Sequence, residues 1–368
     1  MVRIAEQVSP YSTTLLVGVH APYNRTPDIG AYYEEFLHLV RTLGVPYEDV
    51  LYIKLREVDS ATFFTKGKLE EILQKVEELG IEQIIISEPL NALQERNIAD
   101  ILDVDVIDRT RLILDIFEQS AITAEGKTQV EVARLKHEKS RLAGKGHELE
   151  QQKGNIGVRS GAGETLKERQ ARLIDKRILK LKEELIKIQT TRATQRKRRI
   201  ENRVPQLCLI GYTNAGKSSL LNSLTKSDVL SEDKLFATLD TTTRTLNING
   251  IEVGVISDTV GFIQMLPPQL IDAFKSTLSE LEHADLLLHV IDLSDPLWQS
   301  HAEIVHNILR DLEIDKETLY VFNKADKVEM TDELHAQLFS YQPHVISSTL
   351  TKEGLKPLRD ALLKWHAH

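Results

Sequence analysis

Residues 211–218, GYTNAGKS, combine glycine, lysine and serine at the spacing of a phosphate-binding loop. They follow the apolar run 206–211 and precede a helical pattern near 217–225, which is the context that this motif requires. Backbone N–H groups of such a loop, together with the N-terminus of the helix, attract phosphate oxygens. The sequence therefore predicts a site for a nucleoside triphosphate or diphosphate here.

Each residue type in this loop has an expected task. Gly211 and Gly216 allow the tight turn. Lys217 is expected to reach the β- and γ-phosphates, and Ser218 to bind Mg²⁺. The other residues of the segment that are expected to contact the nucleotide are Tyr212, Thr213, Asn214, Ala215 and Ser219.

A second motif, NKAD, follows the apolar run 318–322 and predicts which base is bound. The Asp326 carboxylate can accept two hydrogen bonds from guanine N1 and N2, which adenine cannot supply, so the wrong base is costly. Asn323 is expected to read N7 and brace the phosphate loop, and the Lys324 stem to cover the ring. Backbone amides of Ser347 and Ser348 are expected near guanine O6. GTP and GDP are thus the predicted substrate and product.

The motif DTVGF, residues 258–262, ends another apolar run. Asp258 is expected to bind Mg²⁺ through water, and the Gly261 N–H to contact the γ-phosphate, with Thr259 and Val260 between them. The segment LFATLDTTTR, residues 235–244, is expected to be the first switch loop, which supplies a threonine to Mg²⁺ and the γ-phosphate. Thr238 is the predicted threonine and Thr242 the alternative, and Phe236 and Ala237 are expected beside the nucleotide. The predicted catalytic residues are Lys217, Gly261 and Thr238, and the predicted Mg²⁺ ligands are Ser218, Thr238 and Asp258.

Two residues predict how the reaction is controlled. Many GTPases carry glutamine directly after the DxxG glycine to orient the attacking water, and Phe262 stands there instead. Slow intrinsic hydrolysis that a partner accelerates is therefore expected. Asn214 occupies the position at which several K⁺-activated GTPases carry asparagine, so K⁺ activation is a further hypothesis, although asparagine also suits the loop geometry.

The elements that must position these motifs form an α/β pattern from residue 204 to residue 368. Apolar runs predict strands, and helical patterns lie between them, which is typical of a doubly wound domain. The predicted strands are 206–211, 252–257, 285–292, 318–323 and 344–348, and the predicted helices lie near 217–225, 270–283, 297–312, 331–339 and 353–365.

Residues 1–121 predict a second, smaller α/β domain with a largely parallel sheet. Gly44 and Gly80 stand where helices should end in left-handed caps. The predicted strands are 13–19, 50–55, 83–87 and 104–108, and the predicted helices are 32–44, 68–80 and 93–102.

Between the two domains, residues 122–203 lose the strand pattern and predict a helical arm. Helices are expected over 130–142 and 164–189 as an antiparallel pair, joined through the glycine-rich loop 154–163. Residues 127–203 hold 22 Lys and Arg against 10 Asp and Glu, within a chain whose net charge is −9. Such a basic segment in an acidic protein favours a polyanionic partner, nucleic acid being the commonest, over a merely solvated face.

Taken with these motifs, nearly the whole chain resembles the HflX family of ribosome-associated GTPases. The likeness lies in GYTNAGKSSLLNSLT, LFATLDTTTR, DTVGFIQMLPPQLIDAFKSTLSE and FNKAD, in the segment from VIDRTRL to HEKSRL, and in TKGKLEEI. Two departures stand out. The arm loop reads GVRSGAGET, whereas the loop of the family typically reads like GTRGPGET, so Ala162 replaces the proline and Ser160 is an extra residue. In the first switch loop, Thr241 stands where proline is usual.

The resemblance implies binding to the large ribosomal subunit and, in some members, GTP-dependent splitting of stalled or idle ribosomes under stress. It also implies that the arm and its loop approach ribosomal RNA, where Arg159 and the run 196–199 are candidate contacts. Some members use ATP through the N-terminal domain. Lys66, Gly67 and Lys68 are the phosphate-like feature there, but an ordinary helix N-terminus is the simpler interpretation.

Other functions remain as alternatives. An RNA-binding scaffold with a mainly structural nucleotide is compatible with Phe262. A tRNA-modification GTPase shares the loop asparagine but needs a C-terminal catalytic cysteine, and the single cysteine is Cys208. That single cysteine also excludes an internal disulfide framework. No apolar run is long enough to span a bilayer, and nothing suggests a dimer interface, so a cytoplasmic monomer without an integral membrane partner is expected.

Overall fold

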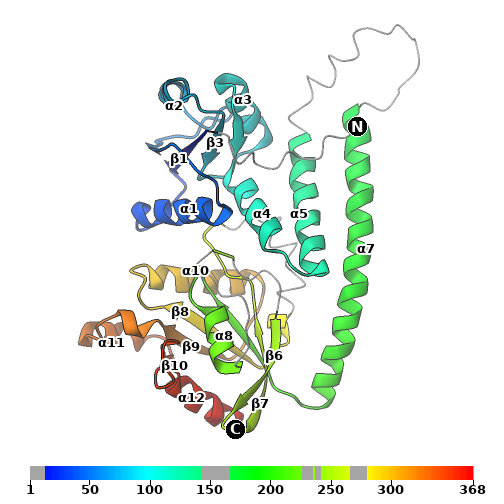
Figure 1. Ribbon diagram of the computed structural model, residues 1–368, viewed down its shortest axis with the longest axis vertical. Helices are drawn as coiled ribbons and strands as arrows, with labels where there is room; N and C mark the ends of the chain where they lie inside the picture. The colour runs from blue at the N-terminus through cyan, green and yellow to red at the C-terminus, as the bar shows by residue number, and fades with distance from the viewer. Residues whose placement is uncertain (1–12, 143–165, 226–234, 237–241, 266–279, 368) are drawn as a thin grey trace. The chain divides into compact units, whose positions relative to one another are not determined.

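The computed structural model describes residues 13–142, 166–225, 235–236, 242–265 and 280–367, and contacts divide the chain into two compact units (Figure 1). The first unit holds the N-terminal sheet and residues 130–183. The second holds residues 120–129 and 184–368. None of the helices in the described ranges is long and apolar enough to cross a membrane. The arm loop, Thr238 and residues 270–279 of the predicted helix 270–283 lie outside the described residues.

The sheet of the first unit is entirely parallel, in the order β2-β1-β3-β4, as expected. Helices α1 and α2 end at Gly44 and Gly80, whose φ values of 79° and 61° are the left-handed caps that the sequence predicted. The elements are β1 (Thr14–His20), α1 (Ile29–Leu43), β2 (Asp49–Lys54), α2 (Lys66–Leu79), β3 (Gln83–Ile86), α3 (Ala92–Leu102) and β4 (Asp105–Ile107).

A helix that the sequence analysis missed, α4 (Arg109–Ser120), follows β4. Its apolar residues point in several directions, and all of Leu112, Ile113, Leu114 and Phe117 are buried. A helix that is covered on most sides shows no single apolar stripe, so its period is hidden in the sequence.

The arm helices are longer than predicted. Helix α5 (Ala124–Leu142) begins six residues before the expected start, and α7 (Leu166–Glu201) continues past the expected end at residue 189 through the basic run 196–199. Within the first unit the two helices run side by side (Figure 1). Ion pairs of 2.6 Å between Lys139 and Asp175 and of 2.7 Å between Arg177 and Glu131 join them in antiparallel order, as predicted.

A buried carboxylate joins α5 to the N-terminal sheet. Asp108, at the carboxyl end of β4, is 1% exposed. It accepts hydrogen bonds from Leu90 N at 3.0 Å, from Arg111 N at 2.8 Å and from Arg141 Nη2 of α5 at 2.9 Å. Arg141 also pairs with Glu95 of α3 at 3.0 Å. The first unit therefore contains the base of the arm as well as the sheet.

The second unit has a six-stranded sheet in the order β10-β9-β8-β5-β7-β6. All pairs are parallel except β6 with β7, and β6 was not predicted because its threonines read as switch loop and only Leu246 and Ile248 face the core. The elements are β5 (Gln206–Gly211), α8 (Lys217–Thr225), β6 (Thr242–Ile248), β7 (Ile251–Asp258), β8 (Leu286–Asp292), α10 (Trp298–Asp311), β9 (Thr318–Asn323), the 3₁₀ turn η1 (Ala325–Lys327), α11 (Asp332–Leu338), β10 (His344–Ile346) and α12 (Lys356–His366).

Strand β5 has β7 on one side and β8 on the other, so the chain changes direction across the sheet at β5. In open α/β sheets ligands bind at the carboxyl ends of the strands at such a point. The predicted phosphate loop begins at the carboxyl end of β5, where the topology expects a ligand.

Replacing Asp108 with alanine is expected to lower the free energy of unfolding of the first unit by about 3–5 kcal/mol, because the amides of Leu90 and Arg111 lose their buried acceptor and Arg141 keeps only Glu95 as an ion-pair partner. Urea unfolding and hydrogen exchange of β1 and β3 amides in the full chain measure this. Asp49→Ala is the matched control, since it breaks the half-exposed Lys75–Asp49 pair and should cost at most about 1 kcal/mol. Equal losses in the two variants would contradict the anchoring role.

Candidate nucleotide-binding site

The backbone of the phosphate loop requires glycine at both ends. Gly211 has a φ of 149°, and a Cβ there would lie 2.2 Å from the backbone oxygen of Val290 in β8. Gly216 has a φ of 93°, and its Cβ would lie 2.3 Å from Asn323 Nδ2 of β9. The loop therefore lies against the carboxyl-terminal parts of β8 and β9, and only glycine permits this approach. Between them Asn214 also has a positive φ, of 60°.

Lys217 lies inside this loop. It is 6% exposed, and its Nζ donates to the carbonyl oxygens of Gly211 at 3.2 Å and Tyr212 at 2.8 Å. Burial lowers the pKa of Lys217 to about 8, and the nearby Asp258 carboxylate opposes this shift. An ammonium group has three N–H donors. Two are held by the loop, so the third is available for a phosphate oxygen, whose negative charge favours the protonated amine.

Ser218 and Asp258 meet at the predicted Mg²⁺ site. The Ser218 hydroxyl donates to Asp258 Oδ2 at 2.6 Å, and Asp258 is fully buried at the end of β7. A hydroxyl and a carboxylate side by side are hard oxygen ligands of the kind that Mg²⁺ prefers. Thr242 pairs with Asp258 across β6 and β7, whereas Thr238 and Ala237 lie outside the described residues, so the choice of threonine stays a prediction.

The rest of the DTVGF motif lies against the loop. Thr259 is buried and donates to Leu209 O at 2.6 Å, and Val260 is 5% exposed. A Cβ added to Gly261 would lie 2.9 Å from Lys217 Nζ, so its backbone reaches the lysine that is expected to bind phosphate. Phe262 is 3% exposed, and its apolar ring has no group that could orient water.

The guanine motif is tied to the phosphate loop. Asn323 is 1% exposed, and its Nδ2 donates to Ala215 O at 3.0 Å, which provides the bracing that the sequence predicted. Its Oδ1 is buried without a hydrogen-bond partner. The Lys324 Nζ donates to Asn214 O at 2.9 Å. The two ends of the nucleotide site are thus a single hydrogen-bonded structure.

The base-reading carboxylate lies in η1, directly after this strand. Asp326 is exposed and accepts a hydrogen bond from the Ser348 hydroxyl. Ser347 and Ser348 are both buried beside it, but their amides donate to Phe322 O and Gly354 O. The amide contacts to guanine O6 therefore stay a prediction, while the Ser348 hydroxyl orients Asp326. Of the first switch, Phe236 is described and is buried with a φ of 58°.

Sequence reasoning missed Asp292, at the carboxyl end of β8. Its Oδ2 lies 2.7 Å from Lys324 Nζ, so it fixes the lysine stem that was expected to cover the base. Its place at the end of a strand beside β5 is a signal that could have identified it.

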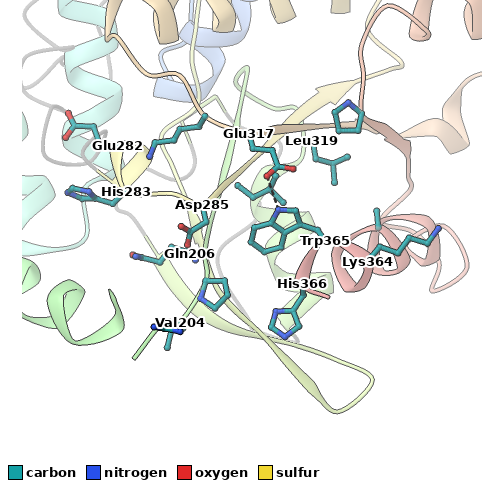
Figure 2. A pocket seen from close by; sticks show the side chains of 16 residues that line it. Val204, Gln206, Glu282, His283, Asp285, Glu317, Leu319, Lys364, Trp365 and His366 are labelled. Carbon is teal, nitrogen blue, oxygen red and sulfur yellow. Dashed lines mark hydrogen bonds between the residues drawn. The ribbon is translucent and has the colours of Figure 1, made fainter. Parts of the chain in front are cut away.

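A pocket of about 950 Å³ lies at the amino ends of the strands of this sheet, opposite the phosphate loop (Figure 2). Gln206, Leu286 and Leu319, at the amino ends of β5, β8 and β9, line it together with Trp365 of α12. The indole N–H of Trp365 donates to Glu317 at 3.2 Å. The pocket contains none of the predicted nucleotide residues, so it is separate from the nucleotide site.

Asp326→Asn is expected to weaken GTP binding by about 10- to 100-fold, because an amide presents one acceptor and one donor where guanine N1–H and N2–H need two acceptors. The same variant should bind xanthosine triphosphate more tightly than the wild type does, since xanthine carries a carbonyl at C2. Competition of both nucleotides against a fluorescent GDP analogue measures the ratio. An unchanged ratio would remove Asp326 from base selection.

Comparison with known proteins gives the same assignment. Three family models match in succession: the GTP-binding GTPase N-terminal model over residues 31–118, the GTP-binding GTPase middle region over 120–199, and the 50S ribosome-binding GTPase model over 206–324. The crystal structure of SsGBP with GDP is 27% identical, covers 96% of this chain and 98% of its own, and superposes with a TM-score of 0.52.

Curated relatives named GTPase HflX match most of the chain. The protein from Magnetococcus marinus is 43% identical over 330 residues, which are 89% of this chain and 76% of that protein. The Escherichia coli protein is 42% identical over 297 residues, which are 80% and 70% of the two chains. With the phosphate loop, Ser218, Asp258 and the NKAD motif brought together at the carboxyl ends of the strands, the chain is a GTPase, and it belongs to the HflX family.

Proposed function

We propose that this GTPase binds the large ribosomal subunit through its N-terminal and helical region and dissociates stalled or idle ribosomes under stress. The 50S ribosome-binding GTPase model that matches residues 206–324 supports a ribosomal partner. The proposal places the protein in the cytoplasm as a monomer, with ribosomal RNA as the surface that the arm contacts.

The observation that carries this proposal is a line of basic residues on α7. Arg169, Arg172, Lys176 and Lys180 are all exposed and follow one another at spacings of three and four residues. At 3.6 residues per turn they lie within about 80° of one another around the helix axis. Such a line presents its charges to one surface and suits the phosphates of an RNA backbone.

The opposite side of α7 is the packed side. Ile174, Ile178 and Leu181 are at most 9% exposed and lie across the helix axis from the basic line. The ion pairs of Arg177 and Asp175 with α5 leave the basic line on the outer face. One face of the helix is therefore packed, while the other carries exposed basic residues.

GTP would control this contact through the first switch loop, residues 235–244, and the DTVGF motif, residues 258–262. Ser218, Thr238 and Asp258 are the proposed Mg²⁺ ligands, and Lys217 and Gly261 the proposed γ-phosphate contacts. If the ribosome and GTP favour the same conformation, each must tighten the binding of the other. Asn214, with its positive φ in the loop, is proposed to support activation by K⁺.

Purified large ribosomal subunits are expected to accelerate GTP hydrolysis at least tenfold, because the buried Phe262 leaves the attacking water unoriented until a partner supplies a group. Single-turnover assays with and without subunits measure this, with Lys217→Ala as the blank. No stimulation by the subunits would favour an RNA-binding scaffold whose nucleotide is structural.

The same assay in K⁺ and in Na⁺ buffer tests the role of Asn214. Equal hydrolysis rates in the two buffers would contradict activation by K⁺.

Lys180→Glu is expected to weaken binding to the large subunit and to reduce the slope of log affinity against log salt by about 1, since one phosphate contact is lost. Lys182→Glu is the matched control. It makes the same charge change on an exposed lysine two residues away, outside the basic line. Sedimentation with subunits at several KCl concentrations measures both. Equal effects in the two variants would show that overall charge, rather than this line, drives binding.

A further inference from the structure

The second residue of the phosphate loop is braced by a helix that carries none of the nucleotide motifs. The ring of Tyr212 lies flat on the imidazole of His301 in α10, with centroids 3.8 Å apart and planes within 5°. Tyr212 is 7% exposed, so this stack is a buried contact. Stacked rings of this kind fix the orientation of both partners.

A carboxylate fixes the histidine in turn. His301 Nδ1 lies 3.2 Å from Asp295 Oδ2, and Asp295 also accepts a hydrogen bond from Leu297 N at 2.8 Å. Asp295 is in the loop between β8 and α10, and Tyr212 directly follows β5. The two residues that contact the His301 ring therefore follow the carboxyl ends of adjacent strands. A carboxylate on one ring nitrogen sets the direction of the imidazole plane, as it does for histidines at many active sites.

Tyr212 holds the segment that follows the DTVG motif. Its hydroxyl accepts a hydrogen bond from Gln264 N at 2.9 Å. Beside it, Thr213 N donates to Phe262 O at 2.8 Å and Phe262 N donates to Gly211 O at 3.1 Å. Residues 262–264 are thus attached to the phosphate loop by two backbone bonds and one side-chain bond.

This attachment sets the position of Gly261. The backbone of Gly261 lies directly before the attached segment, and a Cβ on it would come within 2.9 Å of both Lys217 Nζ and Thr213 Cα. With no room for a side chain, a small displacement of residues 262–264 moves Gly261 relative to Lys217. The geometry at the γ-phosphate therefore depends on the Tyr212 hydroxyl.

We propose that Tyr212, braced by His301 and Asp295, is a positioning residue for GTP hydrolysis that keeps the Gly261 N–H at the γ-phosphate. The inference rests on the proposed contact of Gly261. It does not depend on the ribosomal partner, because the whole chain of contacts lies within the second unit. GDP lacks the γ-phosphate, so its binding should be insensitive to this device.

Tyr212→Phe keeps the ring and removes the hydrogen bond to Gln264. Single-turnover hydrolysis at saturating GTP, without ribosomes, should slow by about three- to tenfold, which corresponds to one hydrogen bond. Affinity for a fluorescent GDP analogue should stay within about twofold. An unchanged rate would overturn the proposal. A loss of GDP affinity as large as the loss of rate would also overturn it, because that pattern indicates a damaged loop.

His301 is tested by rescue. His301→Leu removes the flat ring and should slow hydrolysis with GDP affinity maintained, whereas His301→Phe restores a stacking ring and should recover most of the rate. His306→Leu makes the same change on the same helix, where His306 contacts Tyr320, Tyr341 and His289 rather than Tyr212, and should leave the rate unchanged. Equal rates for His301→Leu and His301→Phe would refute the role of the stack, as would a slow His306→Leu variant.

Discussion

A buried ammonium group is the constraint on which the nucleotide site depends. Lys217 is enclosed at the start of α8, and burial disfavours its charged form, as its lowered pKa shows. Protein dipoles must therefore replace its water. The carbonyls of Gly211 and Tyr212 do so, which is possible only because the loop backbone turns back over the lysine with glycine at both ends. The fold thus holds a cation at the place where the phosphates bring negative charge.

The same loop links two recognition tasks that are far apart in the sequence. Asn323 and Lys324 donate to the carbonyls of Ala215 and Asn214, so the strand end that is proposed to read the base also fixes the phosphate loop. On the other side, Phe262 is bonded to Gly211 and Thr213. The NKAD motif and the segment at Phe262 are therefore both hydrogen-bonded to the phosphate loop, and a movement of either changes the position of the loop.

In the first unit, a buried carboxylate joins the helical arm to the sheet. Asp108 accepts hydrogen bonds from the amides of Leu90 and Arg111 and forms an ion pair with Arg141 of α5. These contacts attach the base of the arm to the N-terminal sheet. The outer side of α7 carries exposed arginines and lysines.

The sequence alone determined the chemistry, because the motif residues are read as short local patterns. GYTNAGKS, DTVGF and NKAD, the parallel sheets and the glycine caps all follow from local spacing and period. Helix α4 and strand β6 did not, since the first is apolar all round and the second is a polar edge strand. Asp292, the stack of His301 on Tyr212 and the Asp108 anchor depend on residues that are distant in the chain. Only the tertiary structure could decide these, because packing, unlike a motif, leaves no fixed spacing in the sequence.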